Sequence, residues 1–107
     1  MDFLQTRNQI SALLEDAISE QNLYLDEPVD LSQGEEALLY GEKGNLDSLS
    51  LITIIADIER KVESEFGIRV KLANEQDLTL ADSRFSTLGK MTDFIVTKIG
   101  VENRQAS

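Results

Sequence analysis

The feature that most constrains this chain is a run of apolar side chains at helical spacing between Asp47 and Gly67. The run has spacings of four, three, four and four residues and consists of Leu51, Ile55, Ile58, Val62 and Phe66. This periodicity predicts one face of a helix that packs on a core. Burying five such side chains contributes on the order of 10 kcal/mol before conformational entropy is subtracted. We therefore expect the fold to be organised around a helix over residues 48–66.

The residues at both ends of this stretch favour helix termini. Asp47 is a good N-cap residue, because its carboxylate can accept hydrogen bonds from the first turn. Gly67 suits the left-handed conformation that ends many helices. Ser48 then becomes the first helical residue, with its hydroxyl in solvent at the positive end of the helix dipole, where a phosphate ester would be favoured. Asp-Ser-Leu by itself is far more typical of an ordinary capped helix start with a surface serine.

A second apolar face lies beside the stripe. Its members are Leu49, Ile52 and Ala56, which fall on the helix at a different angle. This face could complete the core of a small bundle, or it could meet a partner.

The N-terminal segment predicts another helix, from Phe3 to Asn22. Its apolar side chains recur at helical spacing, and no glycine or proline interrupts them. We expect Leu23, Tyr24 and Leu25 to fold back on the core where this helix ends.

The last helix is predicted to start at Ser86 or Thr87 and to run to Ile99. Its core stripe consists of Leu88, Met91, Ile95 and Ile99. Gly100 provides the stop signal, and residues 102–107 are expected to form a disordered polar tail.

Two connections join these helices. Residues 26–47 carry seven acidic side chains against one base, Lys43, and residues 35–40 could form a helical turn. The acids do not have the alternate spacing of a calcium loop, so we expect no metal site. In the second connection, residues 68–72 alternate as a strand would. However, no partner strand is evident, so an extended loop is expected. Residues 82–85 could form one helical turn, with Phe85 facing inward.

These elements predict an all-α fold: one domain over residues 1–107, with a core from about 3 to 100. We expect a small three- to four-helix bundle with a long loop between its first two helices.

The composition excludes much catalytic chemistry. The chain has neither histidine nor cysteine. It therefore has no Ser-His triad, thiolate metal site or disulfide. It also contains no glycine-rich phosphate loop. We expect the chain not to be an enzyme on its own.

The charge of the chain is unevenly distributed. The formal net charge is −10, and residues 1–50 hold eleven acids against two bases. Such a field repels nucleic acid and anionic lipid and favours basic partners, although acidity can also serve solubility alone. We find no signal pattern and no stretch long enough to insert into a membrane, so a cytoplasmic location is expected.

Taken in order, these features resemble the acyl carrier protein family. The resemblance covers about residues 4–99. It rests on a first helix, a long acidic loop and Gly-Asn-Leu-Asp-Ser-Leu at 44–49, which opens an aliphatic helix ending Glu-Phe-Gly-Ile at 65–68. A second loop, a turn at Phe85 and a last helix follow. The long second helix and long acidic connection look most like stand-alone carriers of specialised pathways in lipid or secondary metabolite biosynthesis.

The resemblance implies a function centred on Ser48. In that family the matching serine carries 4′-phosphopantetheine, which a phosphopantetheinyl transferase attaches from coenzyme A. The thiol of that arm holds acyl or aminoacyl groups as thioesters for partner enzymes. Asp47 matches the aspartate that helps to engage the transferase. The remaining partners implied are an acyl- or aminoacyl-adenylating enzyme, or an acyltransferase or synthase, acting on a monomeric carrier.

The resemblance also implies a use for the second apolar face. Leu49, Ile52 and Ala56 match positions that meet partner enzymes, and Asp57 and Glu59 could supply negative charge beside them. The alternative is an acidic helical adaptor that binds a basic partner and is never modified.

Overall fold

The chain is described by a computed structural model for residues 3–41, 44, 46–72 and 83–106. Features expected at 42–43, 45, 73–82 and 107 lie outside these residues. The structure is all-α, and its described part has no strand, only two isolated β-bridges. In chain order the elements are α1 (Phe3–Asn22), η1 (Leu31–Glu36), α2 (Ser48–Phe66), η3 (Ser83–Phe85) and α3 (Leu88–Ala106). The predicted fold class, a small helical bundle, is confirmed.

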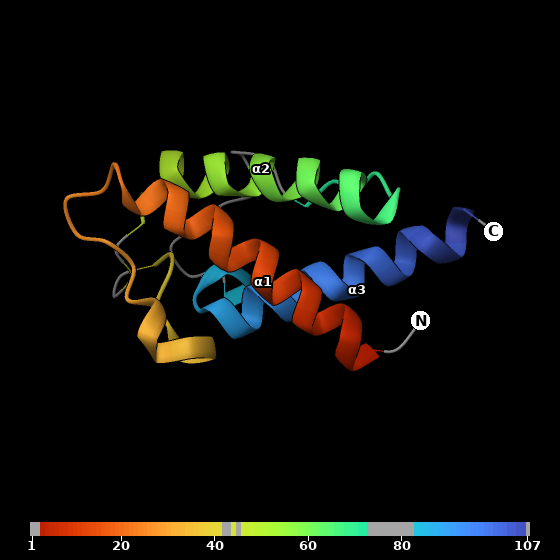
Figure 1. The fold of residues 1–107 in the computed structure, drawn as a ribbon, viewed down its shortest axis with the longest axis horizontal. Coiled ribbons are helices and arrows are strands. Elements are labelled where there is room, and N and C mark those ends of the chain that lie inside the picture. Colours follow the sequence, from red (N-terminus) through yellow and green to blue (C-terminus); the bar gives the residue numbers. More distant parts are fainter. Residues whose placement is uncertain (1–2, 42–43, 45, 73–82, 107) are drawn as a thin grey trace.

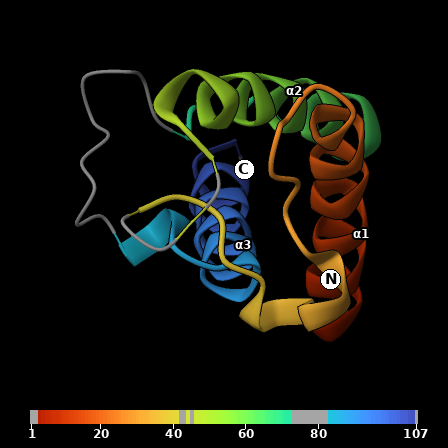
Figure 2. The same cartoon turned by 90° about the vertical axis from the view of Figure 1, so that its left-hand side faces the viewer.

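Helix α1 is the element on which both of the other long helices pack. Figures 1 and 2 show α2 along one side of the bundle, with α1 and α3 below it. The core is formed by aliphatic side chains from all three helices and by residues of the connections. On α1 these are Ile10, Leu14, Ala17 and Ile18. An aliphatic core of this kind lets helices approach one another closely with few polar atoms to satisfy.

The predicted second helix is confirmed at both ends. Helix α2 begins directly after Asp47 and ends at Phe66, before Gly67. Gly67 adopts the left-handed conformation (φ 66°, ψ 21°), and its N–H donates to the carbonyl of Glu63 at 2.9 Å. The stripe is buried at Leu51, Ile55, Ile58 and Val62, and Phe66 is half-buried at its end.

Helix α1 has the predicted bounds, but the expectation for the residues after it was wrong in part. Leu23 and Tyr24 are each 81% exposed, and only Leu25 packs against the core. The reason lies in the chain reversal. The Asn22 side chain accepts from the N–H of Val29 at 2.9 Å and donates to its carbonyl at 3.1 Å. This pair closes the turn over buried Val29 and leaves Leu23 and Tyr24 in solvent.

Helix α3 begins as predicted but continues past its predicted end. Thr87 acts as its cap, since its hydroxyl accepts from the N–H of Lys90 at 3.2 Å. The predicted core stripe of α3 is buried along its length. The predicted stop at Ile99 was wrong, because α3 runs through Gly100 and the expected tail to Ala106. A glycine within a helix costs only about 1 kcal/mol relative to alanine, so it does not by itself end one.

The acidic connection is fastened to the start of α3. Its helical segment lies at residues 31–36 rather than at the predicted 35–40, because Asp30 caps it through the N–H of Ser32. Gly34 (φ 61°, ψ −132°) kinks this segment. Residues 37–40 are instead extended and make main-chain hydrogen bonds to the residues around η3. The N–H of Leu39 donates to Ser86 at 3.0 Å, and that of Tyr40 donates to Phe85 at 3.0 Å. Phe85 is fully buried in its helical turn, as predicted.

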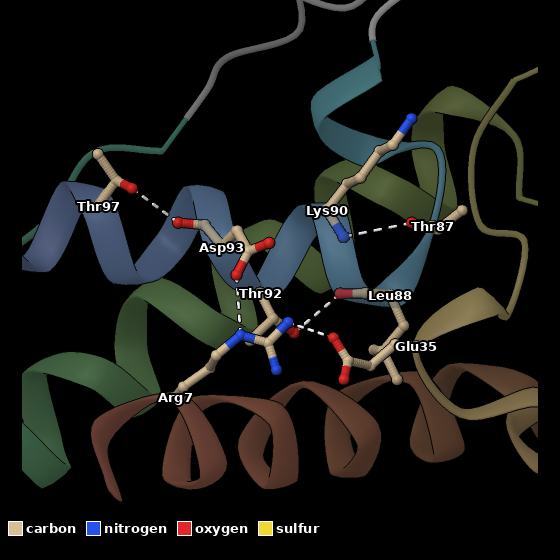
Figure 3. A network of polar contacts seen from close by, with 8 residues as sticks. All are labelled: Arg7, Glu35, Thr87, Leu88, Lys90, Thr92, Asp93 and Thr97. Carbon is tan, nitrogen blue, oxygen red and sulfur yellow. Dashed lines mark hydrogen bonds and ion pairs between the residues drawn. The ribbon is translucent and has the colours of Figure 1, made fainter. Parts of the chain in front are cut away.

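A polar network joins α1, η1 and α3 at one side of the bundle (Figure 3). The Arg7 guanidinium donates from Nε to Asp93 at 2.8 Å and from a terminal nitrogen to Glu35. The hydrogen bonds to Glu35 and then Asp93 raise the pKa of Arg7 above its usual range. Gly89 permits the close approach, because a methyl group there would lie 3.0 Å from the Glu35 side chain.

We predict that Arg7→Gln destabilises the fold by about 1 kcal/mol, because it removes two charge-assisted hydrogen bonds that join three elements. The loss should shrink in about 1 M salt, where surface charges are screened over about 3 Å. Urea unfolding followed by circular dichroism measures both values. Arg60→Gln is the control, since Arg60 pairs with Asp57 on its own helix and should change stability by less than about 0.5 kcal/mol. Equal losses for the two variants would contradict this role of Arg7.

Candidate functional site

The chain is tightly held just before α2. The Leu46 side chain is buried, and its N–H donates to the carbonyl of Leu39 at 3.0 Å. At Gly44 the backbone passes so close to Leu39 that a methyl group would lie 2.1 Å from that same carbonyl oxygen. On the other side, Leu51 is fully buried. The three residues 47–49 therefore lie at the surface between two buried leucines.

Asp47 is the N-cap of α2, as the sequence predicts. Its Oδ1 accepts from the N–H of Ser50 at 2.7 Å, and its carbonyl accepts from the N–H of Leu51 at 3.0 Å. The hydrogen bond from the Ser50 backbone, with another from the Ser50 side chain, holds the pKa of Asp47 below its ordinary value. The carboxylate is thus ionised near neutral pH and fixes the start of the helix.

Ser48 and Leu49 extend into solvent from the first turn of α2. Ser48 is exposed, and no hydrogen bond joins its hydroxyl to another described residue. Leu49 is 74% exposed. The arrangement presents a primary hydroxyl next to an apolar side chain, at a helix terminus with partial positive charge.

The second apolar face of α2 continues from Leu49 toward the middle of the helix. Ile52 is half-buried and packs partly on the core, whereas Ala56 is exposed. Both border a groove of about 570 Å³ between α2 and the end of α1. Its lining comprises Ala17, Glu20, Gln21, Leu23, Tyr24, Ile52, Thr53, Ile54, Ala56, Asp57 and Arg60.

The two predicted acidic residues of this face are engaged within the chain. The Asp57 side chain is 13% exposed, and it pairs with Arg60 and with Lys61, whose Nζ lies 3.4 Å from Oδ2. The Glu59 carboxylate accepts from the N–H of Leu72 at 2.8 Å and so holds the second connection on α2. Glu59 therefore lies away from the groove and has a structural contact of its own.

Sequence reasoning missed the contribution of α1 to this surface. Its core stripe passes through Ile10, Leu14 and Ile18, and continuing that spacing leads to Leu25 rather than to Leu23 or Tyr24. The phase of the stripe could therefore have identified these two residues as solvent-facing. The phase of the stripe does not predict that Leu23 and Tyr24 lie beside Ile52 of α2, because that position depends on how the two helices cross.

Other kinds of site find little support in the described residues. These residues contain no group of three or more potential metal ligands. None of their helices is both long and apolar enough to cross a membrane. The chain matches no family model, no curated protein and no solved structure.

We predict that Gly44→Ala destabilises the chain by about 1–3 kcal/mol, because the new methyl group would overlap the Leu39 carbonyl and force the backbone before α2 to shift. Chemical denaturation measures the change. Gly100→Ala is the matched control. A methyl group there meets nothing within 4 Å, and alanine should stabilise α3 by about 0.5–1 kcal/mol. A neutral effect of Gly44→Ala would contradict the close approach.

We also predict that Asp47 makes stability depend on pH. Because its pKa is lowered in the folded state, the ionised form stabilises the fold above the ordinary aspartate value of about 3.9. That contribution is lost as the pH falls through the lowered pKa. Asp47→Asn keeps a capping side chain that does not titrate.

Unfolding curves between about pH 5 and about pH 2 should therefore lose stability faster for the original chain than for Asp47→Asn. The other carboxylates are common to both proteins and cancel in the comparison. At neutral pH, Asp47→Ala should be the least stable of the three, because it has no cap. Parallel pH profiles would show that the Asp47 carboxylate does not stabilise the helix.

Proposed function

We propose that this chain is a carrier protein of the acyl carrier type, which bears 4′-phosphopantetheine on the Ser48 oxygen. The observation that carries the proposal is the exposed Ser48 hydroxyl at the first residue of α2, directly after the Asp47 cap. Buried residues on either side hold it at the surface. The absence of histidine and cysteine fits a protein whose reactive sulfur comes with a prosthetic group.

The residues around Ser48 fit a phosphodiester. An anionic ester there would lie at a helix N-terminus, where N–H groups and the helix dipole favour negative charge. Asp47 would place a second negative charge nearby. However, its Oδ1 accepts from the Ser50 N–H within the helix, which offsets part of the repulsion. The exposure of Ser48 and Leu49 leaves space for the arm and for the enzyme that attaches it.

Loading requires one substitution at phosphorus. The Ser48 Oγ forms a bond to the phosphorus that bears pantetheine in coenzyme A, and the bond from that phosphorus to adenosine 3′,5′-bisphosphate breaks. A base of the transferase takes the Ser48 proton, because the chain itself offers no histidine. Asp47 holds the helix start in place, and Leu49 offers the transferase an apolar contact. Once attached, the group supplies a thiol that carries acyl or aminoacyl cargo as a thioester.

The enzymes that load and use the cargo would approach the same end of α2. An adenylating enzyme or acyltransferase with a basic surface would be attracted by the acidic first half of the chain, with association that slows as salt rises. Leu49, Ile52 and Ala56 share a face of α2 that can contact such an enzyme. The chain would then act as a carrier in a cytoplasmic pathway and not as a catalyst.

The alternative is an acidic adaptor that binds a basic partner without modification. The exposed Leu23 and Tyr24 beside an acidic groove favour it, because they offer a binding surface that does not include Ser48. The two functions differ in what Ser48→Ala does. An adaptor keeps its activity, whereas a carrier loses it.

The proposal predicts that the purified chain gains the mass of one phosphopantetheine when it is incubated with coenzyme A, magnesium and a broad-specificity phosphopantetheinyl transferase. Intact-mass spectrometry measures the gain. Ser48→Ala should show none, because the acceptor oxygen is gone. Ser64→Ala is the matched control, since it removes another exposed hydroxyl of α2 and should load fully. Failure of the folded original chain to load would count against the carrier and favour the adaptor.

A further inference from the structure

The groove between α1 and α2 has an apolar base and two exposed apolar side chains at its edge. Buried Ala17 and Ile54 line it from opposite helices. Leu23 and Tyr24 border it at the end of α1, each 81% exposed. Burying an apolar side chain of this size contributes about 1.5–3 kcal/mol. Leu23 and Tyr24 stay exposed in the isolated chain, so a partner that covers them would gain this free energy.

The charged side chains that line this groove are Glu20, Asp57 and Arg60. After Arg7, α1 contains three acidic residues, Glu15, Asp16 and Glu20, and no base. Glu20 from this segment lines the groove. On the α2 side, the one base that lines the groove, Arg60, is paired with Asp57. An occupant therefore meets apolar surface next to the Glu20 carboxylate, on a chain whose formal net charge is −10.

We propose that this groove docks an amphipathic helix of a partner protein, with leucine-like side chains on its apolar face and lysine or arginine on its flanks. The apolar face would cover Leu23, Tyr24 and Ile52, in the manner of a helix bound in a hydrophobic groove. The basic flanks would face Glu20 at the end of α1. Charge complementarity of this kind sets the orientation and speeds association.

The same charge argues against other occupants. A second copy of this chain would also carry a net charge of −10, so two acidic grooves would repel each other. Nucleic acid and anionic lipid surfaces are repelled for the same reason. A cationic helix is the occupant whose charge fits.

The groove lies close to Ser48 but does not include it. Ile52 follows Ser48 by one helical turn, which is about 6 Å along the axis at about 1.5 Å per residue. A helix bound in the groove would thus sit beside an accessible hydroxyl. The docking proposal holds whether or not Ser48 is modified, and Ser48→Ala should bind the helix as the original chain does.

The test uses a fluorescein-labelled synthetic helix of about 18 residues, or five turns, with leucine on one face and lysine on the other. Its anisotropy is titrated with the full chain. Leu23→Ser combined with Tyr24→Ser should weaken binding at least about tenfold, since it removes two apolar anchors. Leu4→Ser combined with Leu38→Ser is the matched control. These residues are 66% and 47% exposed and do not line the groove, so binding should change by less than about twofold.

Three further measurements complete the test. Ala56→Lys, on the α2 side, should also weaken binding at least about tenfold by placing a cation in the groove. A helix with glutamate in place of lysine should not bind. Equal effects of the groove and control variants, whether both weaken binding or neither does, would show that the helix does not bind in the groove and would overturn the proposal. So would a dimer, measured by sedimentation, that the Leu23 and Tyr24 substitutions abolish, because a second copy would then be the occupant.

Discussion

The position of Ser48 depends on the burial of the apolar stripe of α2. A helix has a fixed rotation per residue, so burying Leu51 and Ile55 fixes the direction of every other side chain on it. Ser48 and Leu49 then face solvent, while Ser50 turns inward and donates to Asp47. The accessible hydroxyl is therefore a consequence of core packing, and it needs no contact of its own to stay exposed.

The acidic connection is stable only because it is fastened at several points. Its many carboxylates repel one another, and a segment of this length would gain much entropy if released. Main-chain hydrogen bonds from Leu39 and Tyr40 to the residues before α3 hold the connection in place against this repulsion and loss of entropy. Arg7 also neutralises the charge of Glu35. Because Leu39 also accepts from Leu46, the same contacts hold the chain that leads into Ser48. The connection thus couples the start of α3 to the start of α2.

Local patterns predicted most of this architecture from the sequence. The stripe of α2, its cap at Asp47 and its glycine end were all readable, since each depends on neighbours along the chain. Two errors arose at helix ends, where a short-range side-chain contact or a tolerated glycine decides where the helix stops. Asn22 closes on Val29 and leaves Leu23 outside, and α3 continues through Gly100. The groove beside Ile52 was not predictable either, because it forms between helices whose crossing no local pattern determines.

The most direct test of the account is the state of Ser48 in the cells that make this protein. The chain should be isolated intact and fragmented in a mass spectrometer. The account predicts a single phosphopantetheine on the fragment that contains Ser48. An unmodified Ser48, in cells where the transferase loads another carrier, would contradict the central claim. The groove between α1 and α2 would then remain as a binding surface of the chain.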